Sequence, residues 1–171
     1  CVFESKSDTE IVLQSYIRDG EGCLARLTGM FAFAVWDSVE QELFLARDPF
    51  GIKPLYYQNR GDCFAFASEI KALVATDRHR GKMHGPGIAD YLTFQYTLGD
   101  KTFFENVRKL MPGHCMRVRA DGSIRIREYW KPRFDKVDDG EEKAARTVRE
   151  LVRESVKNNL HAGVPLGFTL S

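Results

Sequence analysis

Residues 27–57 read LTGMFAFAVWDSVEQELFLARDPFGIKPLYY, and this stretch decides the fold. Residues 30–36 form an uninterrupted apolar run, which predicts a strand covered on both faces. The polar turn at 37–41 and the apolar run at 43–46 predict the returning strand of a hairpin. Pro49, which has no N–H, and Gly51, which can adopt positive φ, end that strand. We therefore expect antiparallel pairing here.

The flanking segments extend this pattern. Residues 52–57 and 63–67 predict a third and a fourth strand around a turn at 59–62, so the simplest interpretation is an antiparallel meander that forms a core. Asp121 and Gly122 predict a further hairpin between strands at 114–119 and 124–129. Four arginines alternate with apolar residues in that hairpin, which is typical of a solvated face and only weakly of a phosphate site; they are Arg117, Arg119, Arg125 and Arg127.

Bulk composition limits the classes of function. The 171 residues suffice for one domain, or one domain and a piece of another. The 25 basic and 24 acidic residues give a net charge of +1, which offers no electrostatic case for nucleic acid or a membrane surface. The four cysteines are widely spaced, so we expect free thiols in a reducing cytosol, and no zinc site or disulfide framework. His79 and His84 lack a carboxylate pattern, and no metal site is expected there.

Two helices are expected near the ends of the chain. Ser7 and Glu10 have the spacing of a capping box, and the helix that follows should end at Gly20 and bury Ile11, Val12 and Tyr16. Residues 141–160 have apolar positions at helical spacing, with charges on the opposite face. An apolar strand at 164–171 follows. The chain does not begin with Met and stops within this strand, so we expect that both ends are cut.

Five segments carry a family resemblance. They are GMFAFAVWD (29–37), LARDPFGIKPLYY (45–57), FASEIKAL (66–73), YLTFQY (91–96) and KLMPGH (109–114). Together they resemble the glutaminase domain of glutamine-hydrolysing asparagine synthetases, which are class II glutamine amidotransferases. The resemblance implies an α+β fold, an αββα sandwich of antiparallel sheets like that of N-terminal-nucleophile hydrolases. It further implies a partial amidotransferase domain at 1–130, a linker at 131–140 and the start of an α/β ATP-binding domain at 141–171.

The resemblance also implies roles for single residues. Asp8 matches the aspartate that binds the α-amino group of glutamine, although by itself the position only favours a helix N-terminus, by about 0.3–1 kcal/mol. Leu170 and Ser171 match the start of the ATP-binding loop, whose glycines do not follow in this chain. Met30 and Ile52 match positions near an ammonia passage, and ordinary core packing would explain both equally well.

Cys1 invites a catalytic assignment, which we reject. Class II amidotransferases use an N-terminal cysteine as nucleophile, but the family places many tens of residues between it and the Ser-Asp element. Here only a few residues separate Cys1 from Ser7 and Asp8, with no Asn-Gly pair between them. We therefore expect the nucleophilic cysteine upstream, no catalytic residue in this chain, and no glutaminase activity from it alone.

The implied activity of the intact enzyme is the hydrolysis of glutamine and the use of the ammonia, with ATP and magnesium, to amidate aspartate to asparagine. The partners would be small molecules (glutamine, aspartate and ATP) and no nucleic acid or membrane. A cytoplasmic location and a homodimer would follow family habit. Two alternatives stay open. One is a related β-lactam or lasso-peptide synthetase that has lost glutaminase activity, and the other is a non-catalytic module that only binds glutamine or a partner.

Overall fold

The computed structural model describes residues 4–5, 7–61, 63–75, 81–135, 140–160 and 167. The chain divides into two compact units, Cys1–Lys131 and Pro132–Ser171, and each is described by itself. The elements of the first unit are α1 (Asp8–Asp19), the 3-10 helix η1 (Gly20–Ala25), β1 (Ala32–Asp37), β2 (Glu42–Arg47), β3 (Tyr56–Asn59), β4 (Phe64–Ala67), α2 (Ile70–Ala75), α3 (Gly85–Phe94), β5 (Arg108–Lys109), β6 (His114–Arg119) and β7 (Ile124–Glu128). The second unit contains α4 (Glu141–Asn159).

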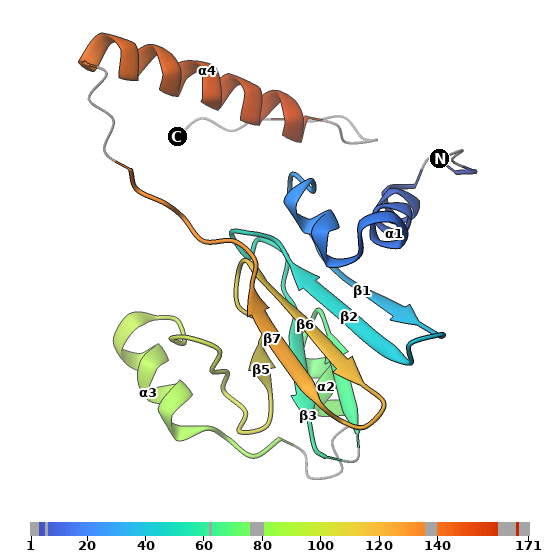
Figure 1. Cartoon of the computed structure of the whole chain (residues 1–171). Helices are drawn as coiled ribbons and strands as arrows, with labels where there is room; N and C mark the ends of the chain where they lie inside the picture. The colour runs from blue at the N-terminus through green and yellow to red at the C-terminus, as the bar shows by residue number, and fades with distance from the viewer. Residues whose placement is uncertain are drawn as a thin grey trace. The chain divides into compact units, whose positions relative to one another are not determined.

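Two antiparallel sheets form the first unit (Figure 1). The larger sheet has the strand order β1-β2-β6-β7, and the smaller has the order β4-β3-β5. The expected hairpins at both ends of this region are confirmed, since β1 pairs with β2 and β6 with β7. The single meander is wrong, because β3 and β4 pair with each other in the second sheet. The mixture of helices and antiparallel sheets confirms an α+β fold.

Two hydrophobic clusters make the core. One joins the two sheets through buried side chains of β2 and β6 and of the segments beside β3 and β5; these are Leu45, Leu55, Leu110, Met116 and Val118. The other joins the opposite face of the larger sheet to η1 through Cys23, Leu24, Phe44, Ala46 and Cys115, with Tyr16 of α1 packed against it. The smaller sheet contacts α2 through β3 and β4. The larger sheet is therefore covered on both faces, which explains why β2 is its most buried strand.

The expected coverage of residues 30–36 on both faces is confirmed only in part, since Phe33 packs against one core cluster and Ala34 against the other, but neither is fully buried. β1 lies at the end of the strand order, and its side chains are half-buried or exposed. Met30 is 46% and Trp36 54% exposed. Only one edge of β1 is paired within the described part of the chain, and this leaves the apolar run less covered than its composition predicts.

The third strand begins later than expected. Residues 52–55 are not in a strand, and β3 starts at Tyr56. The Asp48 carboxylate accepts hydrogen bonds from the backbone N–H groups of Ile52 and Lys53, and Pro54 has no N–H to give to a ladder. The segment therefore folds as a loop instead of joining the sheet.

Helix α1 begins and ends as expected, but it buries less. Ser7 caps it by accepting the N–H of Thr9 at 3.2 Å, and Gly20 ends it. The capping box is only half formed, because Glu10 accepts the N–H groups of Glu4 and Ser5 instead of that of Ser7. Ile11 should face inward but is 50% exposed, whereas Tyr16 stacks on Phe44 with a centroid distance of 4.9 Å.

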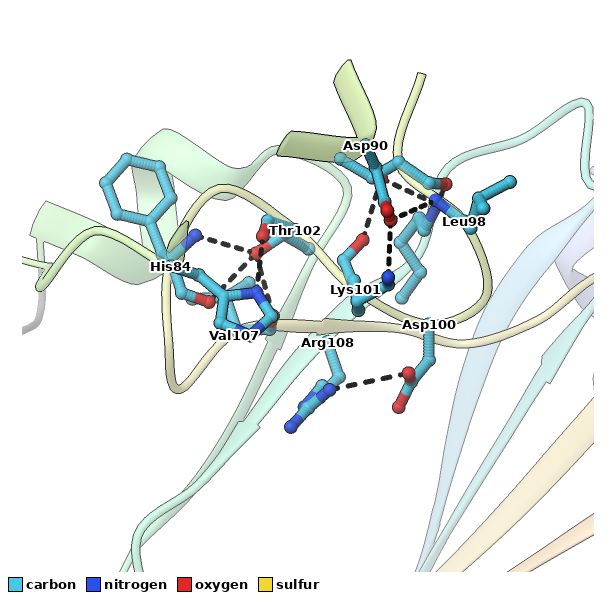
Figure 2. Close-up of polar contacts among 11 residues, drawn as sticks. His84, Asp90, Leu98, Asp100, Lys101, Thr102, Val107 and Arg108 are labelled. Carbon is cyan, nitrogen blue, oxygen red and sulfur yellow. Dashed lines mark hydrogen bonds and ion pairs between the residues drawn. The ribbon is translucent and has the colours of Figure 1, made fainter. Parts of the chain in front are cut away.

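The segment between α2 and β5 is held by polar contacts to its own backbone (Figure 2). Helix α3 begins at Gly85 and has Pro86 in its first turn. The His84 ring lies 3.1 Å from the carbonyl oxygen of Thr102 through Nδ1, and buried Thr102 donates its hydroxyl to Val107. A Cβ on Gly87 would lie 2.1 Å from the same Thr102 oxygen, so only glycine allows this approach. His84 thus has a structural role, while His79 lies outside the described residues.

Three of the four arginines of the β6–β7 hairpin bond to acidic partners. Arg117 and Arg119 both bond to Glu42, whose side chain is buried, and Arg117 and Arg127 both bond to Glu21. These contacts fasten η1 and β2 to the hairpin. The face is therefore exposed to solvent, as the alternation predicted, and also carries an ion-pair network that the alternation did not predict.

Helix α4 confirms the expected helix at 141–160 and ends one residue earlier. Its apolar side chains, which include Val148, Leu151, Val152 and Val156, are exposed. The expected strand at 164–171 lies outside the described residues, apart from Gly167.

Candidate functional site

A pocket of about 650 Å³ lies between the start of α1 and β1. Its walls are mostly apolar, with one acidic and one basic side chain among them. The lining residues are Asp8, Thr9, Val12 and Leu13 of α1, Met30 to Trp36 along β1, and Lys53, Pro54 and Ser68. The volume falls within the range of small-molecule sites. Apolar walls with few charged groups suit a small ligand that is positioned by shape and a few polar contacts. They suit less well a ligand whose charge must be neutralised by several side chains.

Asp8 is the first residue of α1 and lines this pocket. Its side chain is exposed, and no described residue donates a hydrogen bond to it or forms an ion pair with it. The Ser7 hydroxyl takes the capping role, so Asp8 is not needed to satisfy the helix terminus. Its carboxylate is therefore free to accept an ammonium group from a ligand.

Only some of the other expected site residues lie in this pocket. Met30 lines the same pocket as Asp8. Ile52 does not line it and is 58% exposed, although its neighbour Lys53 does line the pocket. Leu170 and Ser171 lie outside the described residues. The structure thus brings together the expected glutamine contact and one of the two expected passage residues.

The loop that carries Ile52 and Lys53 is fixed by two adjacent charged side chains. The Asp48 carboxylate, 1% exposed, accepts the backbone N–H groups of Phe50, Ile52 and Lys53 at 2.9–3.0 Å. Burial alone would raise the pKa of Asp48, but these N–H groups hold the pKa below its usual value. The carboxylate is therefore ionised in the folded state at neutral pH.

Arg47 holds the same loop through a second set of hydrogen bonds. Its guanidinium donates to the carbonyl oxygens of Gly51, Lys53 and Leu110, each at 2.7 Å. Gly51 has a φ of +65°, and a Cβ there would lie 2.7 Å from Pro112. One wall of the pocket is thus set by backbone contacts to Arg47 and Asp48, which sequence reasoning did not single out. The local signal was an acidic residue directly before Pro and Gly, a typical turn composition.

The described lining of the pocket offers few polar side chains. Its lining includes the hydroxyls of Thr9 and Ser68 but neither a cysteine nor a histidine, and the structure describes all of these lining residues. Across the described residues, no three side chains of His, Cys, Asp or Glu gather as a metal site would require. None of the described helices has the length and apolar character needed to cross a membrane. The described lining therefore presents two hydroxyls, one carboxylate and one ammonium group to a ligand.

Comparisons with known proteins agree with the sequence resemblance. The chain is 37% identical over 169 residues to asparagine synthetase [glutamine-hydrolyzing] 1 of Bacillus subtilis, which covers 99% of this chain and 27% of the relative. It is 35% identical over 170 residues to asparagine synthetase 3 of the same organism, covering 99% and 28%. It is also 34% identical over 173 residues to amidase chry2 of Gibberella zeae, covering 99% and 25%. The chain spans about a quarter of the length of these relatives.

A solved structure shares the fold. It is the glutamine phosphoribosylpyrophosphate amidotransferase from B. subtilis complexed with ADP and GMP, matched with a TM-score of 0.52 and 21% identity over 77% of this chain and 24% of that chain. At this identity the match concerns the fold alone. The family model described as a glutamine amidotransferase domain matches residues 1–130. The resemblance to the glutaminase part of asparagine synthetases is thus confirmed, and the chain belongs to the glutamine amidotransferase domain family.

Proposed function

We propose that this chain provides the glutamine-binding part of an asparagine synthetase that hydrolyses glutamine. The observation that carries this proposal is the position of Asp8, whose carboxylate has no partner among the described residues and lines a pocket within an amidotransferase domain. An exposed carboxylate at this place can hold the α-ammonium of glutamine through charge-assisted hydrogen bonds. The nucleophilic cysteine would come from another part of the complete enzyme, so the 171-residue chain alone would not hydrolyse glutamine.

The second half-reaction is proposed for the remainder of the complete enzyme. There, ammonia would amidate aspartate in a step that consumes ATP with magnesium, and the product would be asparagine. Residues 141–171 would begin the ATP-binding domain after a linker at 131–140, with Leu170 and Ser171 at the nucleotide. Magnesium would be held mainly by the remainder of the complete enzyme, since no three side chains of His, Cys, Asp or Glu gather among the described residues.

Ammonia must pass between the two sites without being protonated by bulk water. Met30 lines the glutamine pocket, and Ile52 projects from the loop that Asp48 fixes beside it. Both side chains are apolar and at least partly exposed, which suits the wall of a passage. We propose this role for both, alongside their packing role.

A second candidate function is supported by the amidase relatives. Amidase chry2 and amidase chyE of Penicillium rubens are 34% and 33% identical to this chain and cover 99% of it, so the scaffold is shared with enzymes that carry other names. A synthetase that forms another amide, such as a β-lactam or a cyclised peptide, without glutaminase activity would fit the same domain. Asp8 favours the first candidate, because a site that no longer binds glutamine has no need of its carboxylate.

The substitution Asp8→Asn in the complete enzyme tests the proposal. It keeps the side-chain shape and removes the charge, which weakens a bond of about 1.5–3 kcal/mol. Glutamine-dependent kcat/KM should fall by roughly 10- to 100-fold, while synthesis from added ammonia should stay nearly unchanged. Ser7→Ala is the matched control, since it removes the helix cap beside Asp8 and should affect both nitrogen sources equally. An equal loss for Asp8→Asn in both assays would exclude Asp8 from the glutamine site.

A further inference from the structure

We propose that a second pocket of the first unit binds a free α-amino acid with a short apolar side chain. The pocket has a volume of about 340 Å³, and its walls come from β3 and β5 of the smaller sheet and from β6 and β7 of the larger sheet. It shares no lining residue with the pocket beside β1. It is therefore a separate site, and the inference does not depend on the binding of glutamine at Asp8.

An acidic side chain in this pocket offers a place for the ammonium group of the ligand. Asp100 lines the pocket, and its side chain is 46% exposed. Its Oδ1 atom forms one long contact, 3.4 Å, with Nη1 of Arg108 (Figure 2). The other carboxylate oxygen, Oδ2, has no partner among the described residues. An ammonium group can therefore bind to Oδ2 through a charge-assisted hydrogen bond.

Two donors in the same pocket suit the α-carboxylate of the ligand. The ammonium group of Lys109 donates to the carbonyl oxygen and the hydroxyl of Thr97, at 2.8 and 3.0 Å, which leaves one of its three N–H donors for a ligand. The hydroxyl of Tyr57 has no hydrogen-bond partner in the described part of the chain. Burial and the nearby Asp100 carboxylate raise the pKa of Tyr57, so its hydroxyl stays protonated at neutral pH and can donate.

The mixture of charges selects against ligands that carry only one sign. His114 also lines the pocket, and its Nδ1 lies 2.8 Å from the carbonyl oxygen of Pro112, which can only accept. The neutral ring therefore carries its proton on Nδ1 and leaves Nε2 as an acceptor. A phosphate or another anion would meet this acceptor and the carboxylate of Asp100, while a simple amine would meet the ammonium group of Lys109. A zwitterion satisfies both sets of groups.

The remaining walls decide which side chain fits. Leu110, Met111 and Ile126 give the pocket an apolar surface, and Ile126 is 46% exposed without a ligand. A branched aliphatic side chain would cover this surface and remove it from water. The volume lies near the lower end of the range for small-molecule sites, which favours a ligand as small as L-valine.

Methyl NMR of the complete protein, labelled with ¹³C at Met and Ile methyl groups, tests the proposal with L-valine as the probe. The methyl signals of Met111 and Ile126 should shift and saturate, whereas that of Met30 in the other pocket should not. Shifts confined to Met30, or no shifts up to about 10 mM L-valine, would overturn the inference. L-valine is neither a substrate nor a product of the proposed reaction. Saturable shifts at Met111 and Ile126 in an enzyme that fails to hydrolyse glutamine would therefore overturn the proposed function alone.

The variant Asp100→Asn tests the ammonium contact. The dissociation constant of L-valine should rise about five- to tenfold, a modest factor because Asp100 is partly exposed. Asp121→Asn is the matched control, since it removes the same charge at the exposed turn of the β6–β7 hairpin, and it should change the constant less than about twofold. An unchanged constant in Asp100→Asn would overturn the inference.

N-acetyl-L-valine tests the same contact without any variant, because it lacks the ammonium charge. It should bind to the native protein about five- to tenfold more weakly than L-valine, and Asp100→Asn should weaken it no further. Equal binding of the two compounds would identify a site for carboxylates and would contradict the proposed zwitterion.

Discussion

Replacing Asp48 by Asn should destabilise the first unit far more than its small change in shape suggests. The asparagine oxygen can still accept the N–H groups of Phe50 and Ile52, which share Oδ1 at 3.0 Å, but as weaker neutral bonds. The amide NH₂ would then face the N–H of Lys53, now 2.9 Å from Oδ2, and leave this partly buried donor unsatisfied. An unsatisfied buried donor costs about 1–3 kcal/mol, and the two weakened bonds add about 1 kcal/mol. We expect a total loss of about 2–4 kcal/mol.

Urea unfolding followed by tryptophan fluorescence would measure this loss, because Trp130 packs on Phe50 of the same loop at 5.1 Å. Asp37→Asn is the matched control, since Asp37 also accepts two backbone N–H groups, but at an exposed turn. The control should lose less than about 1 kcal/mol. Equal losses for the two variants would refute the reasoning that burial of Asp48 decides the outcome.

The ionisation of the Asp48 carboxylate makes the stability of the first unit depend on pH. The folded-state pKa of Asp48 lies below its usual value, since the backbone N–H groups outweigh the effect of burial. A lowered pKa stabilises the fold above the unfolded-state value near 4, and the contribution is lost as the pH falls through the folded-state pKa. The difference in unfolding free energy between the native chain and Asp48→Asn should therefore shrink below about pH 4. Urea titrations at pH 7 and pH 3 would show this.

Three further predictions concern other parts of the chain. Gly113→Ala should cost about 2 kcal/mol or more in urea unfolding, because Gly113 has a φ of +66° and a Cβ would lie 2.4 Å from the carbonyl oxygen of Trp130. With Ellman's reagent at pH 8, in a chain that carries Cys1→Ser, exposed Cys63 should react quickly and buried Cys115 slowly, because burial raises the pKa of Cys115 to about 11; adding Cys63→Ser should remove the fast reaction. The 171-residue chain should release no ammonia from glutamine, and a release abolished by Cys1→Ala would show that Cys1 is the nucleophile after all.

The sequence predicted elements with strong local signals. The β6–β7 hairpin has Asp121-Gly122 at its turn and alternating side chains along both strands, and α4 has apolar positions at helical spacing. Such signals depend on neighbouring residues only. The start of β3 was missed because the carboxylate of Asp48 competes for backbone N–H groups that a strand would otherwise use. That competition depends on the burial of one side chain, which periodicity does not reveal.

The candidate site was predictable only in part. Asp8 was identified through the family resemblance, since its helix position alone suggested no more than a favourable end charge. Lys53 and the length of β1 as pocket walls were not foreseen, because the pocket exists only where α1 and β1 meet at the edge of the sheet. Met30 and Trp36 are exposed for the same reason, because β1 lies at the edge of the larger sheet. A strand's place in the sheet order decides how much of it is covered, and an apolar run does not encode that place.

The loop between β2 and β3 has a consequence for sequence variation. Arg47 and Asp48 hold Ile52 and Lys53 through their main-chain atoms, so the side chains at positions 52 and 53 do not determine the shape of the loop. These two positions can therefore diversify among homologues, or in a designed library, while Gly51 stays fixed by its positive φ. Evolution could thus alter the chemistry that this loop presents beside the pocket without rebuilding the backbone that presents it.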